Sequence, residues 1–199
     1  MTTNVLHIDS SLFGASGVSA QLGSNLMTTL GETLGDLNIT HRDLGREPLP
    51  HFDADTIAAI GEGRAELADT LIAELQAADI LVLGVPMYNF GIPSVLKAWF
   101  DHVARAGTTF KYTETGPVGL LENKKVFVIT TRGGKHRDAP TDTQTPYLQT
   151  MLGFLGLKDV QFIYAEGLNL SGGVREEAVA LAEAEIASGV KALAIGEVA

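Results

Sequence analysis

Two stretches of the sequence contain residues suited to binding a planar, phosphorylated ligand. The first includes Met87, Tyr88 and Phe90, which offer a flat apolar wall beside the amide of Asn89. The second, from Ser10 to Ser19, combines hydroxyl groups with small residues. Ligand sites are lined mainly by apolar and aromatic side chains, whereas hydroxyls and free backbone N–H groups bind phosphate oxygens. A planar heteroaromatic ring fits the first stretch, and an anion fits the second.

The hydroxyl-rich stretch connects a β-like run, residues 4–9, to an amphipathic helix. One apolar face of that helix is marked by leucines three or four residues apart, at Leu22, Leu26, Leu30, Leu34 and Leu37. Ser19 is a plausible N-cap. The N-terminus of a helix attracts anions, because it presents unpaired N–H groups and the positive end of the helix dipole. An ordinary serine-rich capping loop is the alternative, and this stretch alone does not decide between the two.

Several familiar catalytic and nucleotide-binding patterns do not occur in the sequence. The chain has no cysteine, which excludes disulfides, thiolate nucleophiles and cysteine-based metal sites. No G-x-G-x-x-G follows the first predicted strand, and there is no P-loop motif and no G-x-S-x-G. Dinucleotide Rossmann, P-loop and serine-hydrolase sites are therefore not predicted. No metal site is predicted either, since there is no metal-ligand spacing among His7, His41, His51 and His102.

Length and charge narrow the class of protein. The chain fits one domain, residues 1–199, which is long enough to bury a full core. Its 14 lysines and arginines against 24 acidic residues give a formal net charge of −10, which repels nucleic acid and anionic membranes. The N-terminus lacks the pattern of a signal peptide, and no apolar run of about 18 residues occurs. We therefore expect a cytoplasmic protein with no nucleic-acid or membrane partner.

The elements that must position these residues alternate between strand and helix. Strands are predicted at 4–9, 39–44, 81–85, 126–130 and 160–164, the third and fourth being buried on both faces. Beyond the leucine-marked helix, helices are predicted at about 55–78, with a break near Gly61–Gly63, and at about 93–106, 146–155 and 174–193. This alternation predicts an α/β, flavodoxin-like three-layer sandwich around a five-stranded parallel sheet of order 2-1-3-4-5.

Two further segments have alternative interpretations. Residues 107–121 form a long irregular excursion, which is more often functional than a mere connection. Trp99 and Phe100 belong to a helix that is apolar on more than one face. They either contact a second subunit or complete the core.

The predicted sheet order brings three loops to one crevice. The first and third strands are neighbours, so the loops that follow them flank a switch point where ligands bind. The loop Thr131–Gly134 follows the fourth strand, on the other side of Met87–Phe90. Paired glycines permit positive φ and let backbone donors approach a ligand, although a plain turn explains them equally well. A phosphate cradle, an aromatic wall and a glycine turn together predict an FMN-sized pocket.

The sequence resembles the family of FMN-dependent NADH azoreductases and NADH:quinone oxidoreductases, the type 1 azoreductases. The resemblance covers nearly the whole chain. It rests on Pro86-Met87-Tyr88-Asn89-Phe90, Ala104-Arg105-Ala106-Gly107-x-Thr109-Phe110-x-Tyr112-Thr113-Glu114, Arg132-Gly133-Gly134, Pro140-Thr141-Asp142, Thr145-Pro146-Tyr147-Leu148 and Ala165-Glu166-Gly167. It implies a homodimer with a flavin site at each subunit boundary.

The resemblance also implies which residues surround FMN. The phosphate is assigned to Ser10, Ser16, Gly17, Val18 and Ser19. The isoalloxazine ring is assigned to Met87, Tyr88, Asn89, Phe90, Thr131, Arg132, Gly133 and Gly134. The substrate cavity is assigned, across the dimer, to Tyr112 and Phe154.

The implied activity is that of an FMN-dependent NADH:quinone oxidoreductase that also cleaves aromatic azo compounds reductively. Because the flavin carries the chemistry, no catalytic side chain is required. We expect a ping-pong cycle, in which NADH donates a hydride and leaves before a quinone or azo compound enters the same cavity. His136 is either a proton or hydrogen-bond donor to substrate or a solvated loop histidine. The alternative function is a flavodoxin-type electron carrier, which the acidic charge permits and the 107–121 excursion disfavours.

Overall fold

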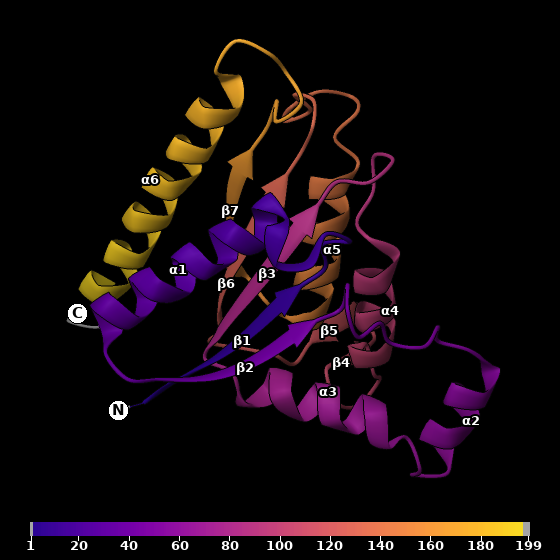
Figure 1. The fold of residues 1–199 in the computed structure, drawn as a ribbon. Helices are drawn as coiled ribbons and strands as arrows, with labels where there is room; N and C mark the ends of the chain where they lie inside the picture. The colour runs from indigo at the N-terminus through magenta and orange to yellow at the C-terminus, as the bar shows by residue number, and fades with distance from the viewer. Residues whose placement is uncertain (1, 197–199) are drawn as a thin grey trace.

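Figure 1 shows a parallel β-sheet between two layers of helices in the computed structural model, which describes residues 2–196. Its five strands lie in the order β2 (Leu37–Asp43), β1 (Thr3–Asp9), β3 (Ile80–Pro86), β6 (Lys125–Thr131) and β7 (Asp159–Ala165). Every neighbouring pair is parallel. The predicted fold class and the strand order 2-1-3-4-5 are confirmed.

Helices cover both faces of the sheet. One face carries α1 (Val18–Leu34) and α6 (Val174–Gly196), and the other carries α3 (Glu66–Ala77), α4 (Ser94–Val103) and α5 (Gln144–Leu155). Side chains alternate along a strand, and all seven residues of the central strand β3 are buried. Leu81 and Leu83 therefore belong to the core beneath α3, α4 and α5, whereas Val82 belongs to the core beneath α1 and α6. Within residues 2–196, no helix combines the length and hydropathy that crossing a bilayer requires.

The break predicted near Gly61–Gly63 is confirmed. It separates α2 (Ala54–Gly61) from α3, and Gly63 lies in the left-handed region at a φ of 68°. The start of α1 differs from the prediction, because its N-cap is Gly17 and not Ser19. A short 3-10 turn, Gly14–Ser16, precedes this cap and fills the space between β1 and α1.

Trp99 and Phe100 lie inside the core of one chain. Both are fully buried, and their rings pack edge-on at a centroid distance of 5.2 Å. The interpretation of these residues as contacts to a second subunit is therefore wrong. The apolar surface of α4 is wide because the sheet and the neighbouring helix α3 both cover it.

Residues 107–121 are more regular than predicted. They contain β4 (Phe110–Thr113) and β5 (Gly116–Gly119), which form an antiparallel hairpin outside the main sheet. The reversal uses Gly116, whose φ of 118° suits a residue without a side chain. The segment then joins the C-terminal end of α5, where the N–H of Leu121 donates to the carbonyl of Leu155 at 3.0 Å.

Candidate functional site

Three loops meet at the edge of the sheet formed by the carboxyl ends of β1, β3 and β6 (Figure 1). We call residues 10–19, 87–91 and 131–137 the loop cluster. The N–H of Met87 donates to the carbonyl of Thr131 at 2.8 Å. On the other side, the N–H of Leu12 donates to the hydroxyl of Tyr88 at 3.1 Å. The loop after β3 is thus bonded to both of its neighbours, as the sheet order requires.

The start of α1 has the features of an anion site. The first N–H groups of a helix have no acceptor within it, and the N-cap Gly17 makes no side-chain bond to them. Ser19 has an exposed fraction of 1%, and its hydroxyl has no partner among the described residues. A buried hydroxyl without a partner costs free energy, so its presence at an uncapped helix start indicates a ligand.

The turn into α1 is tight enough to require glycine. A Cβ added to Gly17 would lie 2.3 Å from the Oγ of Ser11, although the φ of Gly17 is ordinary. The other two serines predicted at the phosphate donate elsewhere. Ser10 donates to the carbonyl of Gly84 at 2.6 Å, and Ser16 donates to that of Phe13 at 2.8 Å. Their assignment to a phosphate stays a prediction, as does that of Ser19, whose hydroxyl is the one of the three with no partner among the described residues.

The loop after β3 forms a strained turn. Tyr88 and Gly91 exchange two backbone hydrogen bonds, each 3.0 Å long. Between them, Asn89 and Phe90 have φ values of 49° and 66°. A bulky residue rarely adopts positive φ, and such strain persists mostly at functional sites. The turn is held by Thr143, whose hydroxyl donates to the carbonyl of Phe90.

The turn presents its aromatic ring to solvent. Phe90 has an exposed fraction of 54%, and its ring meets that of His136 edge-on at 5.8 Å. The structure therefore brings the predicted residue His136 to the predicted aromatic wall. A planar ligand resting there would contact both rings.

Arg132 anchors the loop after β6 through its buried side chain. This side chain is fully buried, and all of its guanidinium nitrogens donate to side chains. The partners are Gln144 at 3.2 Å, Asp142 at 3.0 and 3.1 Å, Glu166 at 3.0 Å and Thr145 at 2.8 Å. Its own N–H donates to the carbonyl of Ala165 at 2.9 Å. Arg132 was predicted to bind the cofactor, and these contacts leave its side chain a positioning role.

Asp142 and Glu166, the acidic partners of Arg132, also bond to neighbouring residues. Burial raises the pKa of Asp142, but hydrogen bonds from Thr145 and Arg132 outweigh it and hold that pKa below its ordinary value. Glu166 also accepts the backbone N–H groups of His136 and Arg137, at 2.8 and 2.9 Å. Residues 132–137 are therefore fixed by one buried network of charges.

The paired glycines do not use the positive φ that glycine permits. Neither Gly133 nor Gly134 has a positive φ. Gly133 and Gly134 instead leave space that a side chain would occupy. A Cβ on Gly133 would lie 2.4 Å from the amide nitrogen of Asn169, and one on Gly134 would lie 2.8 Å from the Nε2 of His136. Among residues 2–196, no acceptor is found for the N–H groups of Gly133, Gly134 and Asn89.

Tyr112 and Phe154, which are predicted to line the substrate cavity across the dimer, lie away from the loop cluster of their own chain. Tyr112 is on the hairpin, has an exposed fraction of 75%, and packs edge-on against Phe110 at 5.3 Å. Phe110 in turn contacts Phe154 at 4.3 Å. The start of α5 touches the loop cluster, where Gln144 donates to the carbonyl of Pro86 at 3.1 Å, whereas Phe154 is at its other end. Within one chain these residues do not meet Phe90 and His136.

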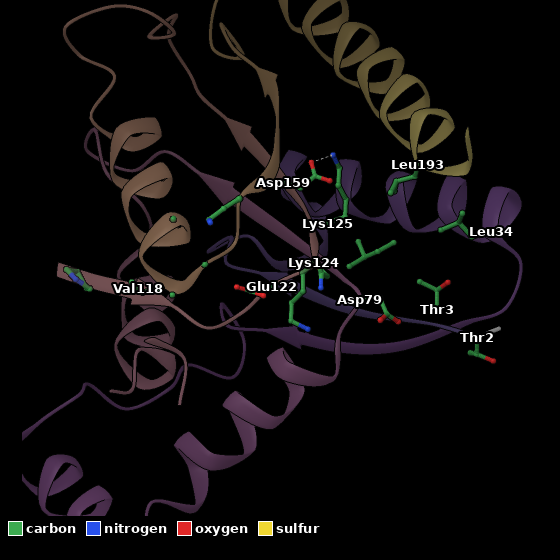
Figure 2. Close-up of a pocket in the computed structure, with 17 residues that line it drawn as sticks. Thr2, Thr3, Leu34, Asp79, Val118, Glu122, Lys124, Lys125, Asp159 and Leu193 are labelled. Atoms are coloured by element: carbon green, nitrogen blue, oxygen red, sulfur yellow. Dashed lines mark hydrogen bonds and ion pairs between the residues drawn. The ribbon is translucent and has the colours of Figure 1, made fainter. Parts of the chain in front are cut away.

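Two hollows in the structure differ in their distance from the loop cluster. Figure 2 shows the larger, of about 1140 Å³, at the opposite edge of the sheet, where Thr3, Ile80 and Lys125 begin their strands. A smaller one, of about 440 Å³, lies beside the turn and is lined by Gly91 and Tyr147. Neither is lined by a residue predicted to bind the cofactor. Burial raises the pKa of Tyr147 to about 12, so its hydroxyl stays un-ionised.

The structure also brings together residues that the sequence analysis kept apart. His7 and Asp9 lie on β1, and His41 is the register partner of His7 on β2. Their ligand atoms all lie within 4.8 Å of one another. Spacing along the chain does not reveal this cluster, because its residues belong to two different strands. Pairing the two predicted strands in parallel register would have found it.

Comparison with known proteins places the chain among flavoproteins. A family model described as "Flavodoxin-like fold" matches residues 3–190. An FMN-dependent NADH:quinone oxidoreductase from Saccharophagus degradans is 62% identical over 192 residues, which cover 92% of this chain and 91% of that protein. One from Cellvibrio japonicus is 50% identical over 192 residues, which cover 92% and 96%.

Solved structures give the same result. An azoreductase from Bacillus anthracis superposes with a TM-score of 0.85 at 30% identity, over 94% of this chain and 98% of that one. An FMN-dependent NADH-azoreductase from the same species, in complex with FMN, has a TM-score of 0.84 at 26% identity, over 97% and 99%. These similarities extend over the strands and loops described above.

Proposed function

The chain belongs to the flavodoxin-like family of FMN-dependent NADH:quinone oxidoreductases, and we propose that it catalyses this reaction. It binds FMN at the loop cluster, oxidises NADH and reduces quinones, and it also cleaves aromatic azo compounds. When bound, FMN accepts a hydride from the nicotinamide and passes two electrons to the acceptor. The observation that carries this proposal is the buried hydroxyl of Ser19, which has no partner at the uncapped start of α1.

The start of α1 holds the phosphate of FMN. Here the free N–H groups, the helix dipole and the hydroxyl of Ser19 all favour a dianion. The overall charge of −10 opposes any anion at long range, so the local donors must supply the attraction. Gly17 keeps the backbone close to the phosphate by leaving room for Ser11.

The other two loops hold the ring system. Phe90 and Met87 supply apolar surface beside it, and the turn that carries them is fixed by bonds to both neighbouring loops. The N–H groups of Asn89, Gly133 and Gly134 are the available donors for the polar edge of the ring. Fixed donors of this kind stabilise negative charge where it develops during reduction.

A second copy of the chain completes the substrate cavity. Tyr112 is exposed at the end of α5 remote from the loop cluster, so it reaches a flavin only from a partner subunit. Leu12 and Phe13, within the loop cluster, are 66% and 70% exposed and provide apolar surface for such a partner. We therefore propose a homodimer in which the hairpin of one subunit faces the loop cluster of the other.

The two substrates use this cavity in turn. A site bounded by Phe90, His136 and a partner's aromatic residues accepts one planar molecule at a time. Nicotinamide must then leave before quinone or azo compound enters, which gives ping-pong kinetics. Steady-state rates at several NADH concentrations are expected to give parallel double-reciprocal lines, whereas intersecting lines would contradict this order.

Rapid mixing with NADH tests the reaction itself. In the FMN-loaded protein without oxygen, we expect NADH to bleach the visible absorbance of the flavin and a quinone to restore it within each turnover. Flavin that stays oxidised in NADH would instead indicate an electron carrier. Protein that is colourless and takes up no added FMN would overturn the cofactor assignment.

A further inference from the structure

His7, Asp9 and His41 form a polar cluster on the neighbouring strands β1 and β2, beneath α1. The carboxylate of Asp9 lies between the two imidazoles, with its Oδ1 3.5 Å from the Nε2 of His7 and its Oδ2 2.9 Å from the Nε2 of His41. The two rings are 4.8 Å apart. The cluster faces Gly23 of α1, where a Cβ would lie 2.7 Å from the Nε2 of His7.

The inner half of this cluster is buried and incompletely bonded. His7 and Asp9 each have an exposed fraction of 5%. The Nε2 of His7 and the Oδ1 of Asp9 have no hydrogen-bond partner among the described residues. Buried polar atoms are normally hydrogen-bonded, and these two approach each other only to 3.5 Å, so both can accept a further partner.

We propose that His7, Asp9 and His41 bind a divalent transition metal such as Zn²⁺. Two imidazoles and one carboxylate are a common donor set for this ion. Ligand atoms around a tetrahedral zinc lie roughly 3.3 Å apart, given metal–ligand distances of about 2.0–2.1 Å. The Oδ1 of Asp9 lies 3.5 Å from His7 and its Oδ2 lies 2.9 Å from His41, and one ligand atom from each residue falls within 4.8 Å of the others, so small side-chain shifts would bring all three to one ion.

The exposure of His41 provides the entry path. Its side chain is 48% exposed, whereas the side chains of His7 and Asp9 are below 10%. A metal ion therefore enters from solvent past His41 and is held on its inner side by the other two ligands. Water completes its coordination on the open side. Bound there, the ion ties the edge strand β2 to β1 just before Ser10, where the chain turns toward the phosphate loop.

Calorimetric titration with ZnCl₂ tests the site in the FMN-loaded protein, freed of metal and of any histidine tag. We expect one equivalent to bind. His41→Ala and His7→Gln should each weaken that binding by at least about tenfold, since each removes one direct ligand. The matched control is His51→Ala, which removes an exposed histidine outside the cluster and should change nothing.

Cobalt supplies a spectroscopic readout that misfolding would not imitate. Co²⁺ in place of Zn²⁺ should give visible ligand-field bands at wavelengths beyond the flavin absorption, and His41→Ala should abolish them. His41 lies at the protein surface on an edge strand, so this variant is expected to fold. Equal binding of Zn²⁺ by the parent protein, His41→Ala and His51→Ala would overturn the proposal. So would a parent protein that binds no Zn²⁺.

Discussion

The hydroxyl of Tyr88 accepts a hydrogen bond from the backbone N–H of Leu12 at 3.1 Å, which fastens the loop after β3 to the loop after β1. The two loops are 76 residues apart in the chain, yet each limits the movement of the other. The proposed ring-binding turn therefore also orders the proposed phosphate loop. An effect on FMN binding is expected from changes at either end of this bond.

Tyr88→Phe removes the bond and keeps the ring. A neutral hydrogen bond contributes about 1 kcal/mol, so we expect FMN affinity to fall roughly fivefold. The measurement is a titration of the metal-free apoprotein with FMN, followed by quenching of flavin fluorescence. Tyr112→Phe, on the exposed hairpin, is the control and should bind FMN normally. Unchanged affinity in Tyr88→Phe would show that the loops hold their positions without this bond.

Ser19→Ala separates the phosphate from the rest of the cofactor. A hydrogen bond to a charged group contributes about 1.5–3 kcal/mol, so FMN affinity should fall at least about tenfold. Riboflavin has no phosphate, and its affinity should not change. The apoprotein should be at least as stable as the parent in urea, because the substitution removes a buried hydroxyl that has no partner.

Ser24→Ala is the matched control for that experiment. Ser24 also lies on α1 but is exposed and further from the helix start. It should leave both affinities unaltered. A parallel loss of riboflavin affinity in Ser19→Ala would contradict a direct role at the phosphate.

Asp142→Asn tests how much the buried network around Arg132 contributes to the free energy of unfolding, and how that contribution depends on pH. The pKa of Asp142 is lower in the folded chain than its ordinary value, so its carboxylate stabilises the fold above about pH 4. That contribution is lost as the pH falls through the lowered pKa. Removing one partner of a buried pair costs about 3 kcal/mol, and we expect that loss at pH 7.

Urea unfolding at pH 7 and near pH 3 measures this difference. The gap between the parent and Asp142→Asn should narrow at the lower pH, where the parent begins to lose the same charge. Asp138→Asn is a suitable control, because its side chain is 94% exposed and contacts Arg137 only at 3.9 Å. A gap that stays constant with pH would exclude the carboxylate as the source of the stabilisation.

The sheet and its loops could be predicted because they depend on local patterns. The buried apolar run 81–85 indicates a strand without reference to the rest of the chain. The glycines at 61 and 63 likewise indicate a break in a helix. Parallel alternation then leaves few topologies, and it places the loops after β1, β3 and β6 at one edge.

What the sequence could not indicate depends on contacts between distant segments. Arg132 looked like a ligand residue, yet its charge is neutralised by acids 10 and 34 residues away. His7 and His41 meet only through strand register, which a reading along one segment does not supply. The hairpin at 110–119 was hidden because its strands are four residues long and mostly exposed.

Mixing two inactive variants would decide whether Tyr112 acts across the dimer. Ser16→Asp places a carboxylate on the exposed turn before α1, where it repels the phosphate of FMN without burying a charge. Tyr112→Ala keeps the loop cluster and loses the aromatic residue of the hairpin. In a mixed dimer, the Tyr112→Ala subunit binds FMN and receives Tyr112 from its partner. We therefore expect quinone turnover to reappear when the variants are unfolded together and refolded. Turnover that stays at the level of separately refolded variants would place Tyr112 outside the partner's site.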